Sequence, residues 1–281
     1  MNKKVLSVLL VAAMAFSAVA CSKDNGGNKN NSNSNSNSGE KNASVVLDNE
    51  YFNISKNGPY YELDGLSDKG KTQESLVIPA GVIISGSIRD GVVKHISFES
   101  DDDVEIYSFF STSTTLETIE LPANMTRLCS FSNCTALKEI TIPKLITSIP
   151  DTFFSGDVSL EKVVIEGNVT EIGNQAFKDC KSLKEINIPD SVTSIGNWAF
   201  HGCESLTEVT LPSGLKSIGE LAFSDIGLQT VTVPAEMELE TWDGAAFIQL
   251  DKSYTVKVKE GSWADIHFDE VFQGQAIKEY Y

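Results

Sequence analysis

Apolar residues recur along this chain with a period close to 23 residues. Six leucines mark the period, at spacings of 21, 23, 23, 23 and 22 residues: Leu116, Leu137, Leu160, Leu183, Leu206 and Leu228. After each leucine, apolar and polar residues alternate up to a proline, as in residues 183–189 (LKEINIP) and 206–212 (LTEVTLP). This alternation predicts a short strand with one buried face. The proline ends the strand because it cannot donate to a sheet ladder.

The second half of each repeat runs through Thr-Ser-Ile-Gly to an Ala-Phe pair, at Ala176-Phe177, Ala199-Phe200 and Ala222-Phe223. We expect the isoleucine and phenylalanine to fill the interior, and the Asn-x-Ala-Phe segment to form a short helical turn. The alanine is small because a neighbouring coil packs closely there. One unit cannot bury its own apolar side, so the units must stack into a continuous core.

These phrases resemble the BspA-like leucine-rich repeats of bacterial surface proteins, with their Leu-x-x-Ile-x-Ile-Pro and Ile-Gly-x-x-Ala-Phe-x-x-Cys segments. The resemblance covers roughly residues 73–260. It implies a leucine-rich-repeat solenoid of the β-dominated α/β class: a right-handed stack of about eight coils of 20–23 residues with a parallel sheet and short helical turns. For some members of the family it also implies adhesion to host matrix proteins.

The ends of the stack need caps. Residues 43–72 alternate around the turn signal Lys56-Asn57-Gly58-Pro59, which predicts a β-hairpin over the first coil. The solenoid then occupies residues 73–253, and residues 254–281 are expected to close the other end with a strand and a short helix.

Residues 1–20 have the pattern of an export signal, with Lys3 and Lys4 ahead of an apolar stretch. Its ending, Ala18-Val19-Ala20-Cys21, resembles the lipobox of bacterial lipoproteins and implies lipidation of Cys21. Ordinary cleavage after Ala18-Val19-Ala20 is the alternative. Residues 21–42 are rich in Asn and Ser and predict a disordered linker behind the lipidated cysteine.

Charge and histidine content exclude some classes of function. The formal net charge is -17, from 22 Lys and Arg against 39 Asp and Glu, which argues against a nucleic-acid partner. The three histidines, His95, His201 and His267, occupy different repeat positions, so no catalytic set gathers around them. We therefore expect no enzyme activity and no cofactor.

One repeat position holds Cys134, Cys180 and Cys203, with Asp157 and Asp225 assigned to it in other repeats. We expect free thiols that act as small buried apolar groups, with a Cys180–Cys203 disulfide as the alternative. Metal binding there is not expected. The run of three aspartates at residues 101–103 predicts a solvated loop, with a calcium site as the alternative.

The outward strand positions form columns across neighbouring coils. Lys138, Glu161 and Lys184 make one column, and Glu139, Lys162 and Glu185 make the next, so opposite charges face each other between strands. A third column is small and β-favouring, which predicts a flat face without a pocket: Thr141, Val164, Asn187, Thr210 and Thr232. A flat polar face suits a macromolecule better than a small molecule.

Trp198 stands at a variable repeat position, where its equivalents are Gln175 and Leu221. An outward Trp198 beside Leu221 is the candidate partner-binding pair, since interface hot spots use such anchors. The alternative is that Trp198 only covers the neighbouring turn.

The sequence thus predicts a non-catalytic protein-binding module on a monomeric lipoprotein, an adhesin for host matrix proteins. A glycan-capture lipoprotein and a cell-envelope scaffold are the alternatives. The lipid on Cys21 would hold it at the cell envelope, on the outer membrane, with surface and periplasmic exposure both open.

Overall fold

The computed structural model describes residues 49–88, 91–102, 104, 106, 110–249, 252–272 and 275–281. The export signal, Cys21 and the linker lie outside these residues. The described residues belong to one compact unit, Val46–Tyr281.

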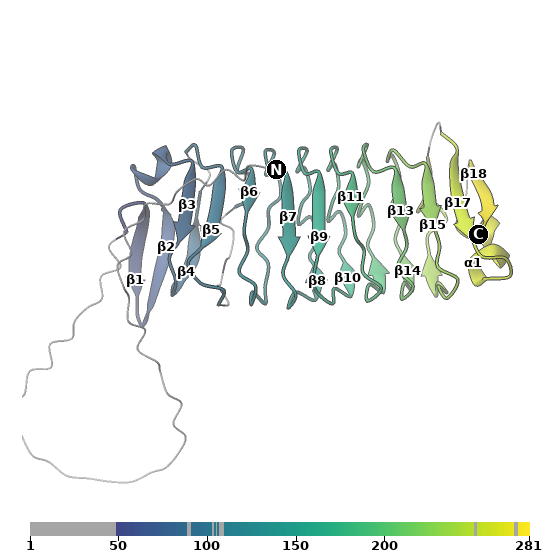
Figure 1. The fold of residues 1–281 in the computed structure, drawn as a ribbon, viewed down its shortest axis with the longest axis horizontal. Coiled ribbons are helices and arrows are strands. Elements are labelled where there is room, and N and C mark those ends of the chain that lie inside the picture. The colour runs from purple at the N-terminus through teal and green to yellow at the C-terminus, as the bar shows by residue number, and fades with distance from the viewer. Residues whose placement is uncertain are drawn as a thin grey trace, which may run out of the picture. The chain divides into compact units, whose positions relative to one another are not determined.

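The unit is a stack of coils whose post-leucine strands run parallel along one side (Figure 1). We call this side the strand face. Its first sheet has six strands: β3 (Ser75–Ile78), β5 (His95–Phe98), β6 (Thr118–Ile119), β7 (Glu139–Ile142), β9 (Lys162–Ile165) and β11 (Glu185–Ile186). Its second sheet has four: β13 (Glu208–Thr210), β15 (Thr230–Thr232), β17 (Tyr254–Val258) and β18 (Ala276–Tyr280). The parallel solenoid expected from the repeats is confirmed.

A further parallel sheet, separate from the two sheets of the strand face, is built from the Ser-Ile dipeptides and their equivalents. Its strands are two residues long: β8 (Ser148–Ile149), β10 (Glu171–Ile172), β12 (Ser194–Ile195), β14 (Ser217–Ile218) and β16 (Thr241–Trp242). The sequence analysis had assigned the isoleucine of this motif to the core but had not identified the segment as a strand.

Both ends are capped. At the N-terminal end, β1 (Phe52–Asn57) and β2 (Tyr60–Leu66) form the expected hairpin. β2 also pairs in parallel with β4 (Val82–Ser87). A short 3₁₀ helix, η1 (Gly70–Thr72), follows the hairpin in the chain. At the other end the chain forms two short helices, α1 (Trp263–Ile266) and α2 (Phe268–Val271), between β17 and β18. The second helix and β18 go beyond the single strand and helix predicted there.

A column of phenylalanines runs through the core. Neighbouring rings have centroids 5.0–5.9 Å apart and lie mostly parallel, through Phe110, Phe131, Phe154, Phe177, Phe200, Phe223, Phe247 and Phe272. Phe177, Phe200 and Phe223 are fully buried, as predicted. Each ring therefore contacts the coil before it and the coil after it.

The Asn-x-Ala-Phe segments are turns, so the prediction that they are helical is wrong. Their amides bond forward to the next coil, as Trp198 N does to Glu220 O (2.8 Å) and Phe200 N to Ala222 O (2.8 Å). Trp198 has a φ of 61° and Gly202 a φ of 76°. Trp198 lies inside the segment and Gly202 two residues after it, so the left-handed backbone at Trp198 prevents a helix from forming there. Bonds between coils therefore alternate with bonds within the turn, such as His201 N to Trp198 O (3.2 Å).

An asparagine ladder joins the same turns. Asn174 Oδ1 accepts the amide of Asn197 (2.8 Å), and Asn197 Oδ1 accepts the amide of Glu220 (2.8 Å). A Cβ on Gly196 would lie 2.8 Å from Asn174 Oδ1. The Ile-Gly-Asn phrase of the repeats therefore needs glycine because an asparagine of the preceding coil fills that space.

The phenylalanine column predicts a large stability loss on truncation. Phe200→Ala should lower the free energy of unfolding by about 3–5 kcal/mol, because a buried ring is lost between two coils. Trp198→Ala, at a half-buried turn position, should cost less. Thermal melts of the two variants side by side test this. A greater loss for Trp198→Ala than for Phe200→Ala would mean that the core has been assigned to the wrong residues.

Candidate functional site

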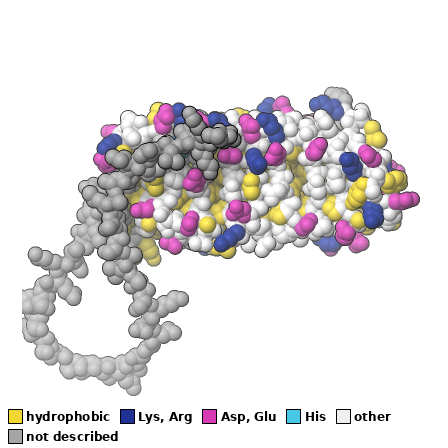
Figure 2. All heavy atoms as spheres, in the orientation of Figure 1, with side chains coloured by type: hydrophobic (Ala, Val, Ile, Leu, Met, Phe, Trp, Pro, Cys, Tyr) yellow, Lys and Arg dark blue, Asp and Glu magenta, His cyan; other side chains and the backbone are white. Residues whose placement is uncertain are grey.

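The strand face carries ion pairs across neighbouring strands. The register aligns Glu139 with Lys162 and Lys162 with Glu185. Lys162 Nζ lies 3.1 Å from Glu185, and Lys184 Nζ lies 2.8 Å from Glu161. The hydrogen bond from Lys184 lowers the pKa of Glu161. The predicted charge columns are confirmed, and Figure 2 shows acidic and basic side chains interspersed over the visible face.

The strand face also has a hollow, where the sequence predicted a flat surface. This strand-face hollow has a volume of about 520 Å³ over β6, β7 and β9. Its lining includes Thr141, Val164, Lys162, Glu120 and Glu166. Thr141 and Val164 belong to the column of small residues, and their short side chains leave space between the longer charged neighbours.

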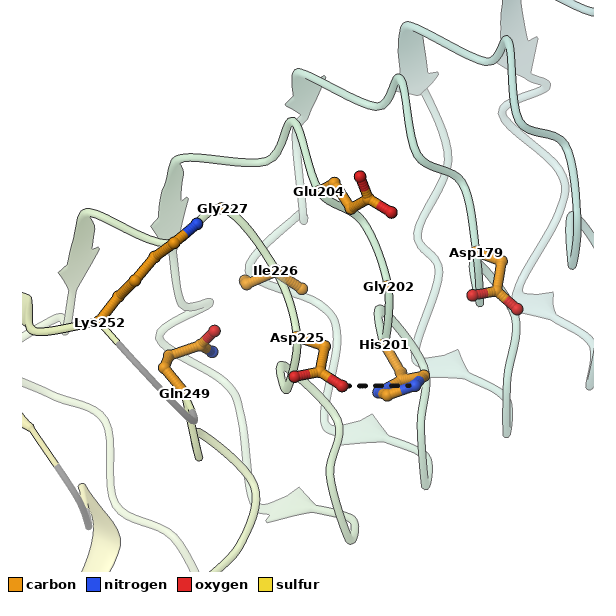
Figure 3. Close-up of a pocket in the computed structure, with 9 residues that line it drawn as sticks. All are labelled: Asp179, His201, Gly202, Glu204, Asp225, Ile226, Gly227, Gln249 and Lys252. Atoms are coloured by element: carbon orange, nitrogen blue, oxygen red, sulfur yellow. Dashed lines mark ion pairs between the residues drawn. The ribbon is translucent and has the colours of Figure 1, made fainter.

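A second groove lies among the turns that follow the phenylalanines (Figure 3). This turn groove has a volume of about 600 Å³ and draws its lining from four successive coils. Its lining residues are Asp179, His201, Gly202, Glu204, Asp225, Ile226, Gly227, Gln249 and Lys252. In Figure 3 the Asp225 carboxylate points towards His201, and Asp225 Oδ2 lies 4.0 Å from His201 Nε2.

His201 lies between a serine and an aspartate, but the three do not form a nucleophilic triad. His201 Nδ1 lies 2.8 Å from Ser224 Oγ, while that hydroxyl donates to Leu221 O at 3.0 Å. Its proton is already used, so Nδ1 must be the donor to Ser224. Ser224 is also buried. The set therefore lacks an exposed hydroxyl activated by a base.

The two predicted partner-binding residues occupy equivalent turn positions in adjacent coils. Trp198 and Leu221 have φ values of 61° and 54°, and both are half-buried rather than outward-facing. Lys178 Nζ lies 5.2 Å from the centre of the Trp198 ring, and His201 packs edge-on against it at 4.8 Å. The turn position points the indole along the coil surface, where Lys178 covers it.

The cysteines of the repeat are free and buried: Cys129, Cys134, Cys180 and Cys203. The thiols of Cys180 and Cys203 donate to the carbonyls of Phe154 (3.1 Å) and Phe177 (3.2 Å) of the preceding coil. Burial raises the pKa of the Cys180 thiol, which makes it unreactive. The expectation of free thiols is confirmed.

The assignment of Asp225 to this position is wrong by one residue. Asp225 has a φ of 50°, like Asp179, and is exposed, whereas Ile226 is buried. The repeat is one residue shorter after Ile226, so counting back from Leu228 misplaced it.

Asp157 does occupy the cysteine position, and it is fully buried. Its Oδ1 accepts the amide of Cys134 at 2.8 Å, whereas Oδ2 has no hydrogen-bond partner among the described residues. Burial raises the pKa of Asp157 to about 9, so the carboxyl group is neutral at pH 7. A protonated Oδ2 supplies a donor of the kind that the thiols provide in other coils.

The other two histidines lie on other elements than the turn groove. His95 is on β5, 2.8 Å from Thr118 Oγ1, and His267 lies between α1 and α2. In the described part of the chain no group of three or more His, Cys, Asp or Glu side chains is placed to hold a metal ion. Asp103 lies outside the described residues. No helix among the described segments has the length and apolarity to cross a bilayer.

The repeats match the model of the BspA type leucine-rich repeat region in six copies, over residues 91–184 and 170–280. The chain belongs to this family. Solenoids of the BspA type generally serve as non-catalytic scaffolds for binding proteins. No curated protein matches the chain.

Solved structures of bacterial leucine-rich repeat proteins resemble it at low identity. A leucine-rich repeat protein from Bacteroides ovatus is 18% identical, with a TM-score of 0.39, over 78% of this chain and 66% of that one. The leucine-rich repeat protein TpLRR of T. pallidum is 18% identical, with a TM-score of 0.42, over 82% and 95% of the two chains. The pneumococcal vaccine antigen PcpA is 16% identical, with a TM-score of 0.42, over 77% and 71%.

The sequence analysis did not predict that Asp157 is a neutral buried acid, and it did not predict the strand-face hollow or the turn groove. A signal for the first was available, because an aspartate stands where neighbouring BspA-type coils have cysteine. The turn groove draws its lining from four coils, and Asp179, Gly202 and Asp225 hold one repeat position in three of them. The sequence analysis missed this alignment because it assigned Asp225 to the cysteine position.

Replacement of Asp157 by Asn should remove a pH dependence of stability. The folded-state pKa of about 9 lies above the ordinary 3.8, so the contribution of this carboxyl group is complete below about pH 4 and is lost as the pH rises towards 9. Asp157→Asn keeps the shape without an ionisable group. Its stability relative to wild type should grow by up to about 1.4 kcal/mol per pH unit in that range.

Denaturation of both proteins in urea at pH 5, 7 and 9 measures this difference. An unchanged difference across the three pH values would show that Asp157 does not stay neutral in the folded state.

Proposed function

We propose that this protein is a non-catalytic protein-binding module of the bacterial cell envelope, held by a lipid on Cys21, and that it adheres to host matrix proteins. The observation that carries the proposal is the strand-face hollow on a BspA-type sheet. The hollow is wide and lies among charged side chains that are already paired with one another, as Lys162 is with Glu185. A surface of this kind suits a protein partner, which contacts a broad area through a few well-packed positions.

A location on the cell surface is part of the proposal. One structure with a similar fold is named a leucine rich cell surface protein, from Faecalibacterium prausnitzii, and PcpA is named a vaccine antigen. The lipobox ending at Cys21 and the polar linker behind it supply the tether.

Trp198 and Leu221 remain a second candidate contact. Because Lys178 lies over the Trp198 ring, this indole offers less open surface than a glycan platform needs. We therefore favour a protein partner over a glycan.

Binding to immobilised collagen, laminin and fibronectin, with serum albumin as the control, tests the function. The full chain in detergent should bind at least one matrix protein and not albumin. Val164→Arg should then weaken binding at least about tenfold, because the arginine fills the strand-face hollow. Thr232→Arg, in the same column of the other sheet, is the matched control and should bind like wild type.

Equal losses in Val164→Arg and Thr232→Arg would place the binding surface elsewhere. If none of the three matrix proteins bound above albumin, the adhesin proposal would fall.

Cys21→Ala should release the protein from the membrane fraction or block its processing, since acyl chains on Cys21 are the anchor in this proposal. Fractionation of cells expressing each form, followed by detergent-free washing, measures the release. Full retention of the Cys21→Ala chain in the washed membranes would contradict lipid anchoring at this residue.

A further inference from the structure

The strand face has a seam between β11 and β13. Along both strand-face sheets, the amide just ahead of β6, β7, β9, β11 and β15 bonds to the equivalent carbonyl of the preceding coil. These bonds are Glu117 N to Lys94 O (2.7 Å), Lys138 N to Glu117 O (3.0 Å), Glu161 N to Lys138 O (2.7 Å), Lys184 N to Glu161 O (2.9 Å) and Gln229 N to Thr207 O (2.8 Å). The bond that belongs in this series, Thr207 N to Lys184 O, is not formed, although both residues are described. Figure 1 shows the row of strands interrupted at this point.

The core side chains at the seam are incompletely covered. Ile186 and Ile188 are only half-buried. Their equivalents one coil earlier, Val163 and Ile165, have exposed fractions of 1% and 4%. The two isoleucines lie at alternate positions, the spacing that one face of a strand presents. The seam therefore leaves apolar surface open as well as main-chain groups.

The seam is confined to the strand face. The coils are joined before it by Ser205 N to Lys181 O (3.1 Å) and after it by Ser213 N to Asp190 Oδ1 (2.9 Å). On the other side, β12 pairs with β14, and the Phe177, Phe200 and Phe223 rings keep spacings of 5.1 and 5.0 Å. The stack is therefore continuous except along one strand length.

Asn187 provides a local cause. Its side chain accepts the amide of Ile165 (2.9 Å) and donates to the Ile165 carbonyl (3.1 Å). These are main-chain groups at the end of β9. With its side chain bonded there, the main chain of this coil stops pairing after Ile186, and β11 ends after two residues. Thr141, Val164, Thr210 and Thr232 hold this position in other coils and have no carboxamide.

Charge provides a second cause. Along the outward column, Glu139, Lys162 and Glu185 alternate in sign. The next member is Glu208, which aligns with Thr230 in the following sheet. Closing the seam would bring Glu185 and Glu208 together, and like charges directly opposite each other destabilise a sheet. A lysine between them would restore the alternation.

We propose that the seam is the site at which an extended segment of a partner protein adds as a strand between β11 and β13. This inference rests on the proposed function and names the recognised element. The segment has a Lys or Arg facing outward between Glu185 and Glu208 and apolar residues at alternate positions over Ile186 and Ile188. Only another strand presents donors and acceptors along both of its edges. Entry requires the coils to tilt apart by about one strand spacing, ~4.8 Å, around the continuous phenylalanine column. This opening breaks the bonds from Ser205 N to Lys181 O and from Ser213 N to Asp190 Oδ1 at the two ends of the seam.

The probe is a fluorescein-labelled peptide of residues 159–167 (SLEKVVIEG), because this sequence already pairs with β11 through Lys162 and Glu185. The control peptide has Glu in place of the lysine. Fluorescence anisotropy with the full chain in detergent should show binding of the lysine peptide at least about tenfold tighter than of the control. Amide hydrogen exchange at Thr207 should be fast in the free protein, compared with Gln229, and should slow when the peptide binds.

Two variants close the seam by different routes. Glu208→Lys supplies the missing charge, and Asn187→Thr removes the carboxamide that bonds to Ile165. Both should abolish peptide binding and slow exchange at Thr207 without peptide. Thr230→Lys, one strand further along the column, is the matched control and should bind the peptide as wild type does. If Glu208→Lys fails to fold, Asn187→Thr gives the same test.

The inference is overturned if the Thr207 amide of the free protein exchanges as slowly as that of Gln229. It is also overturned if the two peptides bind equally or neither binds. If either result were obtained and the protein still bound a matrix protein, the proposed function would stand. Only the seam would then be excluded as the binding site.

Discussion

The structure depends on contacts between coils, because no single coil of about 23 residues can bury its own apolar side. Main-chain amides bond to carbonyls of neighbouring coils, and the rings of Phe177, Phe200 and Phe223 stack at spacings near 5 Å. Any position that disturbs this regular spacing affects two neighbours at once. Asn187, whose carboxamide bonds to the main chain of Ile165 in the preceding coil, is such a position, and β11 ends beside it.

The repeat unit could be predicted from sequence because its signals are periodic. The leucine, the alternating strand and the Ala-Phe pair recur often enough that the buried face and the charge columns follow directly. What could not be predicted depends on relations between coils. The Asn-x-Ala-Phe segments were expected to be helical, but alternate amides bond to the next coil, as Trp198 N does to Glu220 O, and only the others bond within the turn. Trp198 looked outward because its position is variable, yet Lys178 from the preceding coil covers it. The leader, the linker and Cys21 lie outside the described residues, so their assignment still rests on sequence.

The two sides of the solenoid differ in what they offer a partner. The turn side has a polar groove in which His201 already bonds to Ser224, and that serine already bonds to a carbonyl. Its polar groups are largely used within the protein. The strand face has paired charges around the strand-face hollow and, further along, main-chain groups at the seam without partners. Because unsatisfied donors and acceptors gain most from a new contact, the strand face is the side on which we expect binding energy to be concentrated.

Hydroxyl-radical footprinting of the full chain, alone and with the matrix protein that it binds, tests this account most directly. We predict that a partner protects strand-face side chains, with Val164 and Ile186 among them, and leaves His201 at the turn groove as reactive as in the free protein. Protection of His201 and Trp198 with an unchanged strand face would contradict the account.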